Sequence, residues 1–360
     1  FALRITDTGT IGVDYYGIGG YYSTGLLRDP SAWYHCVWRV DTTDSTAADR
    51  VKVYVNGELF YNNQMSLAED ADTPINNNVE HTIGVYSYDQ THDYTFDGYL
   101  AEVHFIDGTA LDASSFGETN IETGQWIPKK YAGSYGTNGF YLDFSDNSGT
   151  SDTTLGKDSS GNGNNWTPAN VSVSAGAGND SLIDTPTNNF CVANQLDKGA
   201  VDIDRGGMIV SRSSDTTNWE LCHGTIGIPS SGKWYWEGTV NGDMDGVIMG
   251  VGRTNFNQSL DGENDPGHWY YNTAGYAGYN GSYSSDPAAV TAGQIVQVAF
   301  DRDNNKIWFG VNNTWGLYGG TPVTPTDPNA NHTNIPEDVA PLIGCRSTGQ
   351  VDLNFGQRPF

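Results

Sequence analysis

The stretch Val51-Lys-Val-Tyr-Val-Asn-Gly-Glu-Leu-Phe60 holds the clearest structural signal in this chain of 360 residues. Its three valines alternate with Lys52 and Tyr54, which is the pattern of a strand with one buried face. Asn56 and Gly57 follow directly, and this pair favours the tight two-residue turn of a β-hairpin, whose backbone needs positive φ angles. The stretch therefore predicts two antiparallel strands joined at Asn56-Gly57.

The same alternation of apolar residues recurs along the chain. Strands are expected at 33–40, 81–88 and 98–106. In the second half, three further strands carry apolar residues or glycine at every second position: Trp234, Trp236, Gly238 and Val240; Val296, Val298 and Phe300; and Ile307, Phe309 and Val311. The last two of these strands are expected to pair across a turn at 301–305. Short strands separated by turns at regular intervals predict an all-β protein built from two antiparallel β-sandwiches.

Length and charge exclude several classes of protein. The chain is long enough for two domains of roughly 150 residues each. It has 17 Lys and Arg against 43 Asp and Glu, so the net charge is −26 and the chain repels a phosphate backbone and an anionic membrane surface alike. No run of about 18 apolar residues occurs, so we expect no membrane insertion. Nucleic acid and membranes are therefore not expected partners.

A shift in composition marks the boundary between the two sandwiches. In residues 145–189, 33 of 45 residues are Gly, Asn, Ser, Thr or Asp. Because a strand-like stretch at 140–144 precedes them and Trp166 among them needs a surface to pack on, we expect an ordered bridging segment instead of a free linker. The predicted organisation is a first sandwich over 1–125, a Gly/Asn/Ser-rich bridging segment over 126–190 and a second sandwich over 191–360.

Catalytic motifs begin in several places but are not completed. Residues 227–233 have the glycine spacing of a phosphate-binding loop, but Trp234 stands where a Ser or Thr must hold the magnesium ion. Residues 301–312 begin like a calcium-binding loop but lack its glycine and its bidentate glutamate. Glycoside hydrolysis needs two facing carboxylates, and Asp202 and Asp204 alternate on one strand without further acids. We therefore expect no catalytic residues and no enzymatic activity.

Oxygen-rich loops make calcium the one candidate cofactor. Asp158, Asn162 and Asn164 lie in the run Asp-Ser-Ser-Gly-Asn-Gly-Asn, and calcium takes about six to eight hard oxygen ligands of this kind. A second run, 241–246, has a similar composition. Asx turns use the same residues without any ion. The expected ligands are therefore Asp158, Asn162 and Asn164, with turn chemistry as the alternative explanation.

An aromatic segment between 256 and 286 is the predicted ligand site. Glycines interrupt its rings, and strand geometry buries at most every second ring, so several are expected to face outward and stack on a sugar. Acidic residues just before them would accept sugar hydroxyls or hold a cation. The candidate ligand-binding residues are Trp269, Tyr270, Tyr276, Tyr279, Tyr283, Asp261, Glu263 and Asp265. The alternative is that the rings pack at a sheet edge or against a neighbouring domain or protomer.

Parts of the sequence resemble two known families. Residues 33–60, with Trp-Tyr-His-Cys-Val-Trp-Arg-Val ahead of the hairpin, and residues 96–111 resemble a laminin-G domain, which has a concanavalin A-like, lectin-type jelly-roll fold. The opening strands of such a domain are missing and are expected before Phe1. Residues 191–360 are similar to a SPRY domain, on the motifs Ser231-Gly-Lys-Trp-Tyr-Trp-Glu237 and Met249-Gly-Val-Gly252 and on residues 296–301, 307–312 and 340–343.

The order of these parts resembles structural proteins of marine bacteriophages, of the fibre or tail-associated kind. This resemblance implies a virion structural and adhesion protein, made in the host cytoplasm and displayed on the virion surface, whose sandwich loops attach to a host cell-surface glycan or protein. Other virion proteins are further expected partners. We also expect self-assembly into a trimer, because weak single-site contacts gain from multivalency. The alternatives are a glycan depolymerase or glucanase of a tail spike and a purely architectural capsid decoration or fibre protein.

Overall fold

The structure is a computed structural model that describes residues 2–15, 19–62, 67–86, 94–214, 217–242, 246–255, 267–285, 289–318, 321–322, 325, 330–336 and 338–360. These ranges contain 29 β-strands, three short 3-10 helices and no α-helix, so the predicted all-β class is confirmed. None of the helices in this part of the chain has the length and hydropathy to span a bilayer. The chain divides into two compact units, residues 1–173 with 185–188 and residues 174–184 with 189–360.

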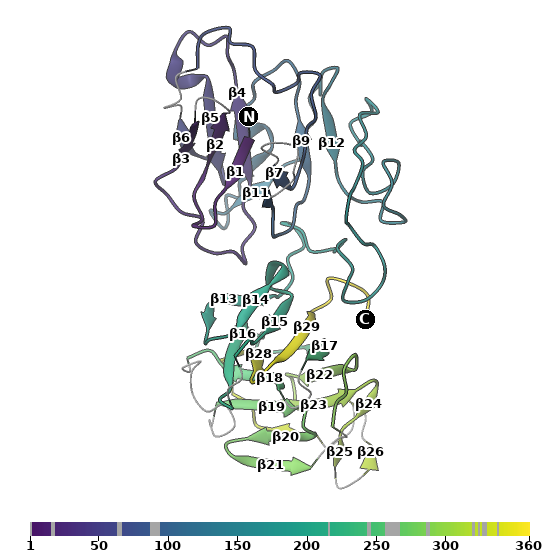
Figure 1. Cartoon of the computed structure of the whole chain (residues 1–360). Coiled ribbons are helices and arrows are strands. Elements are labelled where there is room, and N and C mark those ends of the chain that lie inside the picture. The colour runs from purple at the N-terminus through teal and green to yellow at the C-terminus, as the bar shows by residue number, and fades with distance from the viewer. Residues whose placement is uncertain are drawn as a thin grey trace. The chain divides into compact units, whose positions relative to one another are not determined.

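Two three-stranded antiparallel sheets form the core of the first unit (Figure 1). Their strands are β1 (Ala2–Ile5), β2 (Ile11–Tyr15) and β3 (Gly19–Tyr22) in one sheet, and β4 (Cys36–Val40), β5 (Val51–Val55) and β6 (Glu58–Asn62) in the other. Ile11 and Val13 of β2 pack in one buried cluster with the three valines of β5. The predicted hairpin is confirmed, because Val55 lies opposite Glu58 and the turn residues Asn56 and Gly57 have φ angles of 49° and 83°.

The remaining strands of the first unit form short pairs. They are β7 (Val85–Tyr86) with β8 (Tyr94–Thr95), β9 (Val103–Phe105) with β12 (Phe140–Leu142), and β10 (Gly117–Thr119) with β11 (Trp126–Pro128); the helices η1 (Ala47–Asp49) and η2 (Ala113–Ser115) lie between strands. Strands β11 and β12 come from the segment 126–190 that was expected to bridge the sandwiches. Because both pair with strands that begin before residue 125, the first unit continues to residue 173, and the bridging segment is not a separate unit.

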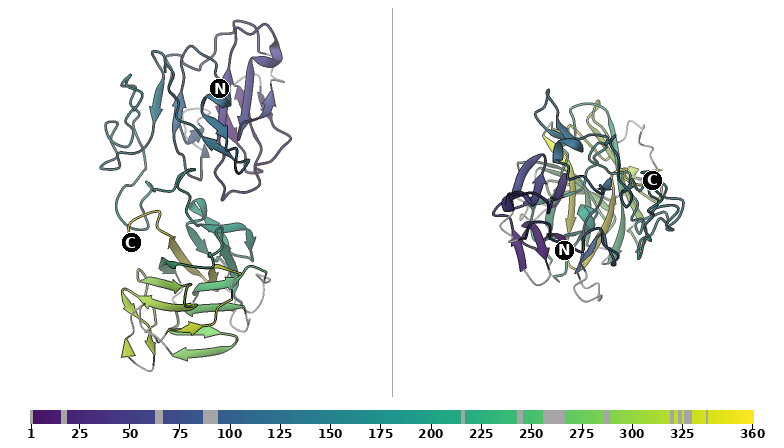
Figure 2. Two further views of the ribbon diagram at one scale, coloured as in Figure 1. Left: turned by 180° about the vertical axis from the view of Figure 1, so that it is seen from behind. Right: turned by 90° about the horizontal axis from the view of Figure 1, so that it is seen from above.

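Two large antiparallel sheets form the second unit, and Figure 2 shows them from two further sides. The seven-stranded sheet has the order β13 (Ala193–Lys198), β16 (Glu220–Gly224), β28 (Val339–Cys345), β18 (Val247–Arg253), β19 (His268–Asn272), β20 (Tyr276–Tyr279) and β21 (Ser282–Ser285). The eight-stranded sheet has the order β14 (Asp202–Asp204), β15 (Ile209–Ser211), β29 (Gly349–Asn354), β17 (Lys233–Gly242), β22 (Ile295–Asp301), β23 (Lys306–Val311) and β24 (Thr314–Trp315), with β27 (His332–Thr333) also paired to β23. The helix η3 (Arg205–Gly207) and the pair β25 (Leu317–Tyr318) with β26 (Thr321–Pro322) complete the unit.

The inner faces of these two sheets carry the alternating apolar residues. The predicted pairing across 301–305 is confirmed, since Val298 lies opposite Phe309 and Phe300 opposite Ile307. The ring of Tyr271, from the seven-stranded sheet, lies with its centroid 6.1 Å from that of Phe309 in the other sheet. The two sheets therefore pack face to face as a sandwich.

Gly238 of β17 lies at a close approach between the two sheets of the second unit. A Cβ at this position would be 2.5 Å from Cγ2 of Val351 and 2.8 Å from Sδ of Met249, which belongs to the opposite sheet. We expect Gly238→Ala to lower the free energy of unfolding of this unit by about 1–3 kcal/mol, because the core must shift to admit the methyl group. Urea unfolding followed by tryptophan fluorescence measures this loss.

The matched control for this variant is Gly227→Ala. Among the described residues other than its chain neighbours, only the carbonyl oxygen of Val339, at 3.9 Å, lies within 4 Å of a Cβ built at Gly227, so this substitution is expected to leave the urea midpoint unchanged. A Gly238→Ala midpoint equal to that of the wild type would contradict the close approach of the two sheets.

Candidate functional site

The outer face of the eight-stranded sheet carries a row of polar side chains at its centre. In β17 the side chain of Trp236 points into the core, so Tyr235 and Glu237 point to the opposite face. Strand register places Gln297 of β22 next to Glu237 on one side and Asn354 of β29 next to it on the other. Glu237, Gln297 and Asn354 are 8%, 5% and 4% exposed. Three polar side chains from three adjacent strands are therefore buried side by side.

A two-residue turn between β23 and β24 extends this row. Val311 lies opposite Thr314, so Asn312 and Asn313 form the turn, with φ angles of 47° and 63°. Asparagine tolerates this left-handed region better than most residues that have a side chain. Oδ1 of Asn312 accepts a hydrogen bond of 2.9 Å from the backbone N–H of Ile295, which ties the turn to β22. The two-residue turn thus places the amide side chains of Asn312 and Asn313 at the end of the polar row.

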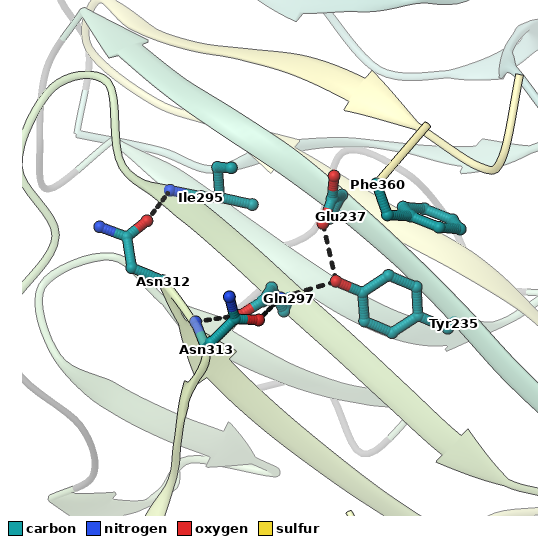
Figure 3. A pocket seen from close by; sticks show the side chains of 7 residues that line it. All are labelled: Tyr235, Glu237, Ile295, Gln297, Asn312, Asn313 and Phe360. Carbon is teal, nitrogen blue, oxygen red and sulfur yellow. Dashed lines mark hydrogen bonds between the residues drawn. The ribbon is translucent and has the colours of Figure 1, made fainter. Parts of the chain in front are cut away.

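A continuous chain of hydrogen bonds connects these side chains (Figure 3). The backbone N–H of Asn313 donates to Oε1 of Gln297 at 2.6 Å, and Nε2 of Gln297 donates to Oη of Tyr235 at 2.7 Å. The Tyr235 hydroxyl donates to Oε2 of Glu237 at 2.7 Å, and Nδ2 of Asn354 donates to Oε1 of the same carboxylate at 3.2 Å. Each side chain is therefore held in place by its neighbours, as a preorganised site requires.

The polar row forms part of a basin of about 440 Å³. Its lining residues are Tyr235, Glu237, Ile295, Gln297, Asn312, Asn313 and Phe360 (Figure 3). Small-molecule sites typically measure roughly 300–1,000 Å³, so the basin is large enough for a ligand. The ring of Phe360, 64% exposed, stands edge-on to Tyr235 at a centroid distance of 4.6 Å, and the ring of Trp315 lies 6.3 Å from Tyr235. Aromatic rings therefore lie beside the polar groups.

The chemistry of the basin suits binding. Glu237 carries the one carboxylate side chain among the seven lining residues, and none of the seven is basic. Burial raises the pKa of Tyr235, and its hydrogen bond to Glu237 raises it further, so the phenol stays protonated at neutral pH. Glycoside hydrolysis needs two facing carboxylates, and this set of lining residues supplies one. The basin therefore offers hydrogen-bonding groups and aromatic rings without a pair of catalytic acids.

The aromatic residues of the predicted ligand site differ from one another in how exposed they are. Trp269 and Tyr270 are 4% and 0% exposed, so the prediction that strand geometry buries at most every second ring is wrong for these two neighbours. Tyr276 and Tyr279 are half-buried, while Tyr283 is 50% exposed, as expected for an outward-facing ring. The three acidic candidates, Asp261, Glu263 and Asp265, lie outside the described residues. Whether these aromatic residues bind a ligand stays a prediction.

Both faces of β19 are covered, which explains the error. Tyr270 lies on the outer face of the seven-stranded sheet, in an apolar cluster whose other buried members are Trp219, Leu221, Ile248 and Leu342. Trp269 stacks on Tyr279 of β20, with ring centroids 4.9 Å apart and an angle of 11° between the rings. Gly278, one of the glycines that interrupt the rings in the sequence, lies within β20 opposite Tyr270, and a Cβ there would collide with the tyrosine ring. This glycine therefore makes room for a packed ring.

Asp158, the first expected calcium ligand, is saturated by hydrogen bonds from the protein. Its carboxylate is 5% exposed and accepts bonds of 2.8–2.9 Å from the backbone N–H groups of Tyr141, Ser160 and Asn164 and from Oγ of Ser160. Burial raises the pKa of Asp158, but these hydrogen bonds together outweigh it, so the pKa lies below its ordinary value. The carboxylate thus organises its own loop.

The other two expected calcium ligands contribute donors to the same loop. Nδ2 of Asn162 and Nδ2 of Asn164 both donate to the carbonyl oxygen of Gly139. In the second candidate run, Asp243 and Asp245 lie outside the described residues. Among the residues that are described, no three His, Cys, Asp or Glu side chains gather as a metal site. The geometry favours the turn interpretation, and calcium binding stays a prediction.

Sequence patterns do not predict the basin, although they contain part of its signal. Glu237 and Gln297 are polar residues inside otherwise apolar strands, in Trp-Tyr-Trp-Glu and Val-Gln-Val. Such residues on the outer face of a sheet need hydrogen-bonding partners when they are buried. The turn at Asn312 and the ring of Phe360 lie next to Glu237 and Gln297 only because of the order in which the strands pair. A local sequence pattern does not contain this information.

The chain is similar to several proteins of solved structure, at low sequence identity. No protein-family model matches the chain, and a search of curated proteins found no match. The SPRY domain of human HERC1 is similar with 16% identity and a TM-score of 0.38, covering 46% of this chain and 99% of that domain. A human SPRY domain has 15% identity and a TM-score of 0.35, covering 45% of this chain and 99% of its own. Stonustoxin has 17% identity and a TM-score of 0.36, covering 46% of this chain and 27% of that protein.

Proposed function

We propose that this chain is a non-catalytic binding protein whose second unit holds a host cell-surface glycan in the basin on its eight-stranded sheet. The observation that carries this proposal is the hydrogen-bond chain from Asn313 through Gln297 and Tyr235 to Glu237, beside the exposed ring of Phe360. Binding sites typically combine apolar and aromatic surface with a few placed polar groups. The basin has both.

The polar groups of the basin match the hydroxyls of a sugar. A hydroxyl group both donates and accepts hydrogen bonds, and the amides of Asn312 and Asn313 and the carboxylate of Glu237 offer both partners. The ring of Phe360 offers an apolar surface for the C–H face of a pyranose. Because internal hydrogen bonds already fix Tyr235 and Gln297, little side-chain entropy is lost when a ligand binds.

The biological setting that we propose is the surface of a phage particle. The order of laminin-G-like and SPRY-like motifs in the sequence supports it, as does the net charge of −26, which suits a protein that avoids nucleic acid. In this setting the chain works as a trimer among other virion proteins, because several weak glycan sites on one particle reinforce each other.

Binding to bacterial envelope polysaccharide tests the proposed function. We expect the full chain to bind capsule or lipopolysaccharide from marine bacteria in a calorimetric titration, and Tyr235→Phe to weaken this binding at least tenfold, because it removes the central hydroxyl of the hydrogen-bond chain. Tyr283→Phe is the matched control, since it removes a hydroxyl from the exposed ring of the predicted aromatic site.

The other outcomes identify the alternatives. Loss of binding in Tyr283→Phe but not in Tyr235→Phe would place the ligand at the aromatic segment. New reducing ends after incubation would show a depolymerase. No binding to any envelope polysaccharide would reject a glycan-binding role and favour an architectural protein.

A further inference from the structure

The hydrogen-bond chain of the basin runs in one fixed direction. The backbone N–H of Asn313 can only donate, so the Gln297 atom that it reaches at 2.6 Å is the oxygen Oε1. Nε2 of Gln297 therefore faces Tyr235 and donates to its hydroxyl, whose own proton is directed to Glu237. Glu237 is thus the end of the chain and accepts on both oxygens, because Nδ2 of Asn354 reaches the other one. The basin ends in an acceptor-only carboxylate.

Within the described part of the chain, no cationic side chain pairs with this carboxylate. Its two partners, a phenol and an amide, are neutral, and among the residues that the structure describes no lysine, arginine or histidine forms an ion pair with Glu237. Glu237 is also only 8% exposed, so water solvates it poorly. A buried charge of this kind is costly unless an opposite charge approaches it.

We propose that the basin selects a glycan carrying a free amino group, and that the ammonium of this amino sugar binds at Glu237. This inference rests on the proposed function, because it assigns the class of sugar to the same site. A charge-assisted hydrogen bond to a carboxylate is roughly twice as strong as a neutral one. The neighbouring rings of Tyr235 and Phe360 favour a cation near their faces as well. An acidic sugar would instead bring a second negative charge to Glu237.

The chemistry around Glu237 favours an amino sugar over a lysine side chain. A lysine reaches the carboxylate with one ammonium group on an apolar stem, which leaves the surrounding amides without ligand partners. Asn312 and Asn313 lie in the same basin, and a sugar ring supplies hydroxyls for them next to its amino group. An amino sugar therefore satisfies both the charge and the amides.

Calorimetric titration with matched oligosaccharides tests the assignment. The probes are a tetramer of glucosamine, a tetramer of N-acetylglucosamine, a tetramer of galacturonic acid and a tetralysine peptide, each titrated into the full wild-type chain at pH 6. We expect the glucosamine tetramer to bind at least tenfold more tightly than its N-acetylated counterpart and the galacturonic acid tetramer to bind weakest. This comparison needs no variant, so it does not depend on whether a substituted chain folds.

Two variants locate the effect at Glu237. Glu237→Gln keeps the size of the side chain but removes its charge, and we expect it to weaken binding of the glucosamine tetramer about tenfold more than it weakens binding of the N-acetylated tetramer. Asp352→Asn is the control, because Asp352 lies on the same face of the sheet and accepts hydrogen bonds from Asn241 and Gln350 but does not line the basin. It removes one charge as well and is expected to change neither affinity.

Each contrary result has a distinct meaning. Equal binding of the two glucosamine-based tetramers would overturn the amine assignment and leave the glycan-binding function intact. Tighter binding of tetralysine than of the glucosamine tetramer would overturn it in favour of a protein partner. Binding of none of these probes would overturn it too, and the envelope polysaccharide titration then decides separately whether the proposed function holds. An equal loss in Asp352→Asn would show a general charge effect in place of a site at Glu237.

Discussion

Replacing Asp158 with alanine is expected to destabilise the first unit by roughly 3–5 kcal/mol. The carboxylate accepts four hydrogen bonds, three of them from the backbone N–H groups of Tyr141, Ser160 and Asn164. Each buried donor that is left without a partner costs about 1–3 kcal/mol, and water entering the space of the lost side chain recovers part of this. A lower urea midpoint and faster hydrogen exchange at these three amides measure the loss.

Asp146→Ala is the matched control for this prediction. Asp146 also accepts hydrogen bonds, from the backbone N–H and Oγ of Ser148 at 3.1 and 2.6 Å, but it is exposed and water replaces these bonds. We expect its unfolding midpoint to equal that of the wild type. The loss in Asp158→Ala is expected to be the same with added calcium and with a chelator. Wild-type protein that loses stability on chelation, while Asp158→Ala does not respond, would show that Asp158 is a calcium ligand after all.

The fold follows from local patterns where strands are neighbours along the chain. The hairpin at Asn56 and Gly57 needs only two turn residues with positive φ and alternating valines around them. The register that brings Val298 opposite Phe309 likewise follows from two alternating strands and a short turn. In both places the information lies within about twenty residues, so sequence alone is enough.

The basin and the burial of β19 depend on contacts that local patterns do not contain. Glu237 receives its hydrogen bond from Asn354, 117 residues away, and Tyr235 receives its bond from Gln297, 62 residues away. Both follow from the order of strands in the sheet. The alternation rule fails at Trp269 and Tyr270 for a related reason, since it assumes that one face of a strand meets solvent. Here distant residues such as Trp219 and Leu342 cover the second face.

Acidification from pH 7 to pH 4 is expected to destabilise both units, because each contains a half-buried histidine with a lowered pKa. His104 in the first unit stacks on Tyr141 at 4.3 Å, and burial, followed by the charge of His35, lowers its pKa to about 4. His332 in the second unit contacts the rings of Tyr279 and Phe309, and burial lowers its pKa to about 4 as well. A histidine in the unfolded chain has a pKa of about 6.5. As the pH falls, the unfolded chain therefore takes up protons before the folded chain does, and this favours unfolding.

The sign and the window of this effect follow from those pKa values. The two neutral histidines contribute their full share to the free energy of unfolding above about pH 6.5. This share falls as the pH drops towards 4, and below pH 4 the histidines cause no further loss. Carboxylates with lowered pKa values, such as Asp158, act only at lower pH still. For His332 the loss amounts to at most about 3–4 kcal/mol, since its pKa falls from about 6.5 to about 4 and each unit of pKa corresponds to about 1.4 kcal/mol. Melting temperatures between pH 7 and pH 4 measure it.

Substitution of the histidines separates their contribution from the general effect of acid. His332→Phe keeps a ring between Tyr279 and Phe309 but cannot take up a proton, so the melting temperature of the second unit is expected to fall less steeply than in the wild type between pH 6.5 and pH 4. His104→Phe is expected to reduce the loss in the first unit without abolishing it, because burial also lowers the pKa of His35 there. His81→Gln removes an exposed histidine and is expected to leave the wild-type pH dependence in place. If the second unit of His332→Phe lost stability as steeply as the wild type in this window, burial of His332 would not be the cause, and protonation of other groups would have to account for the acid sensitivity.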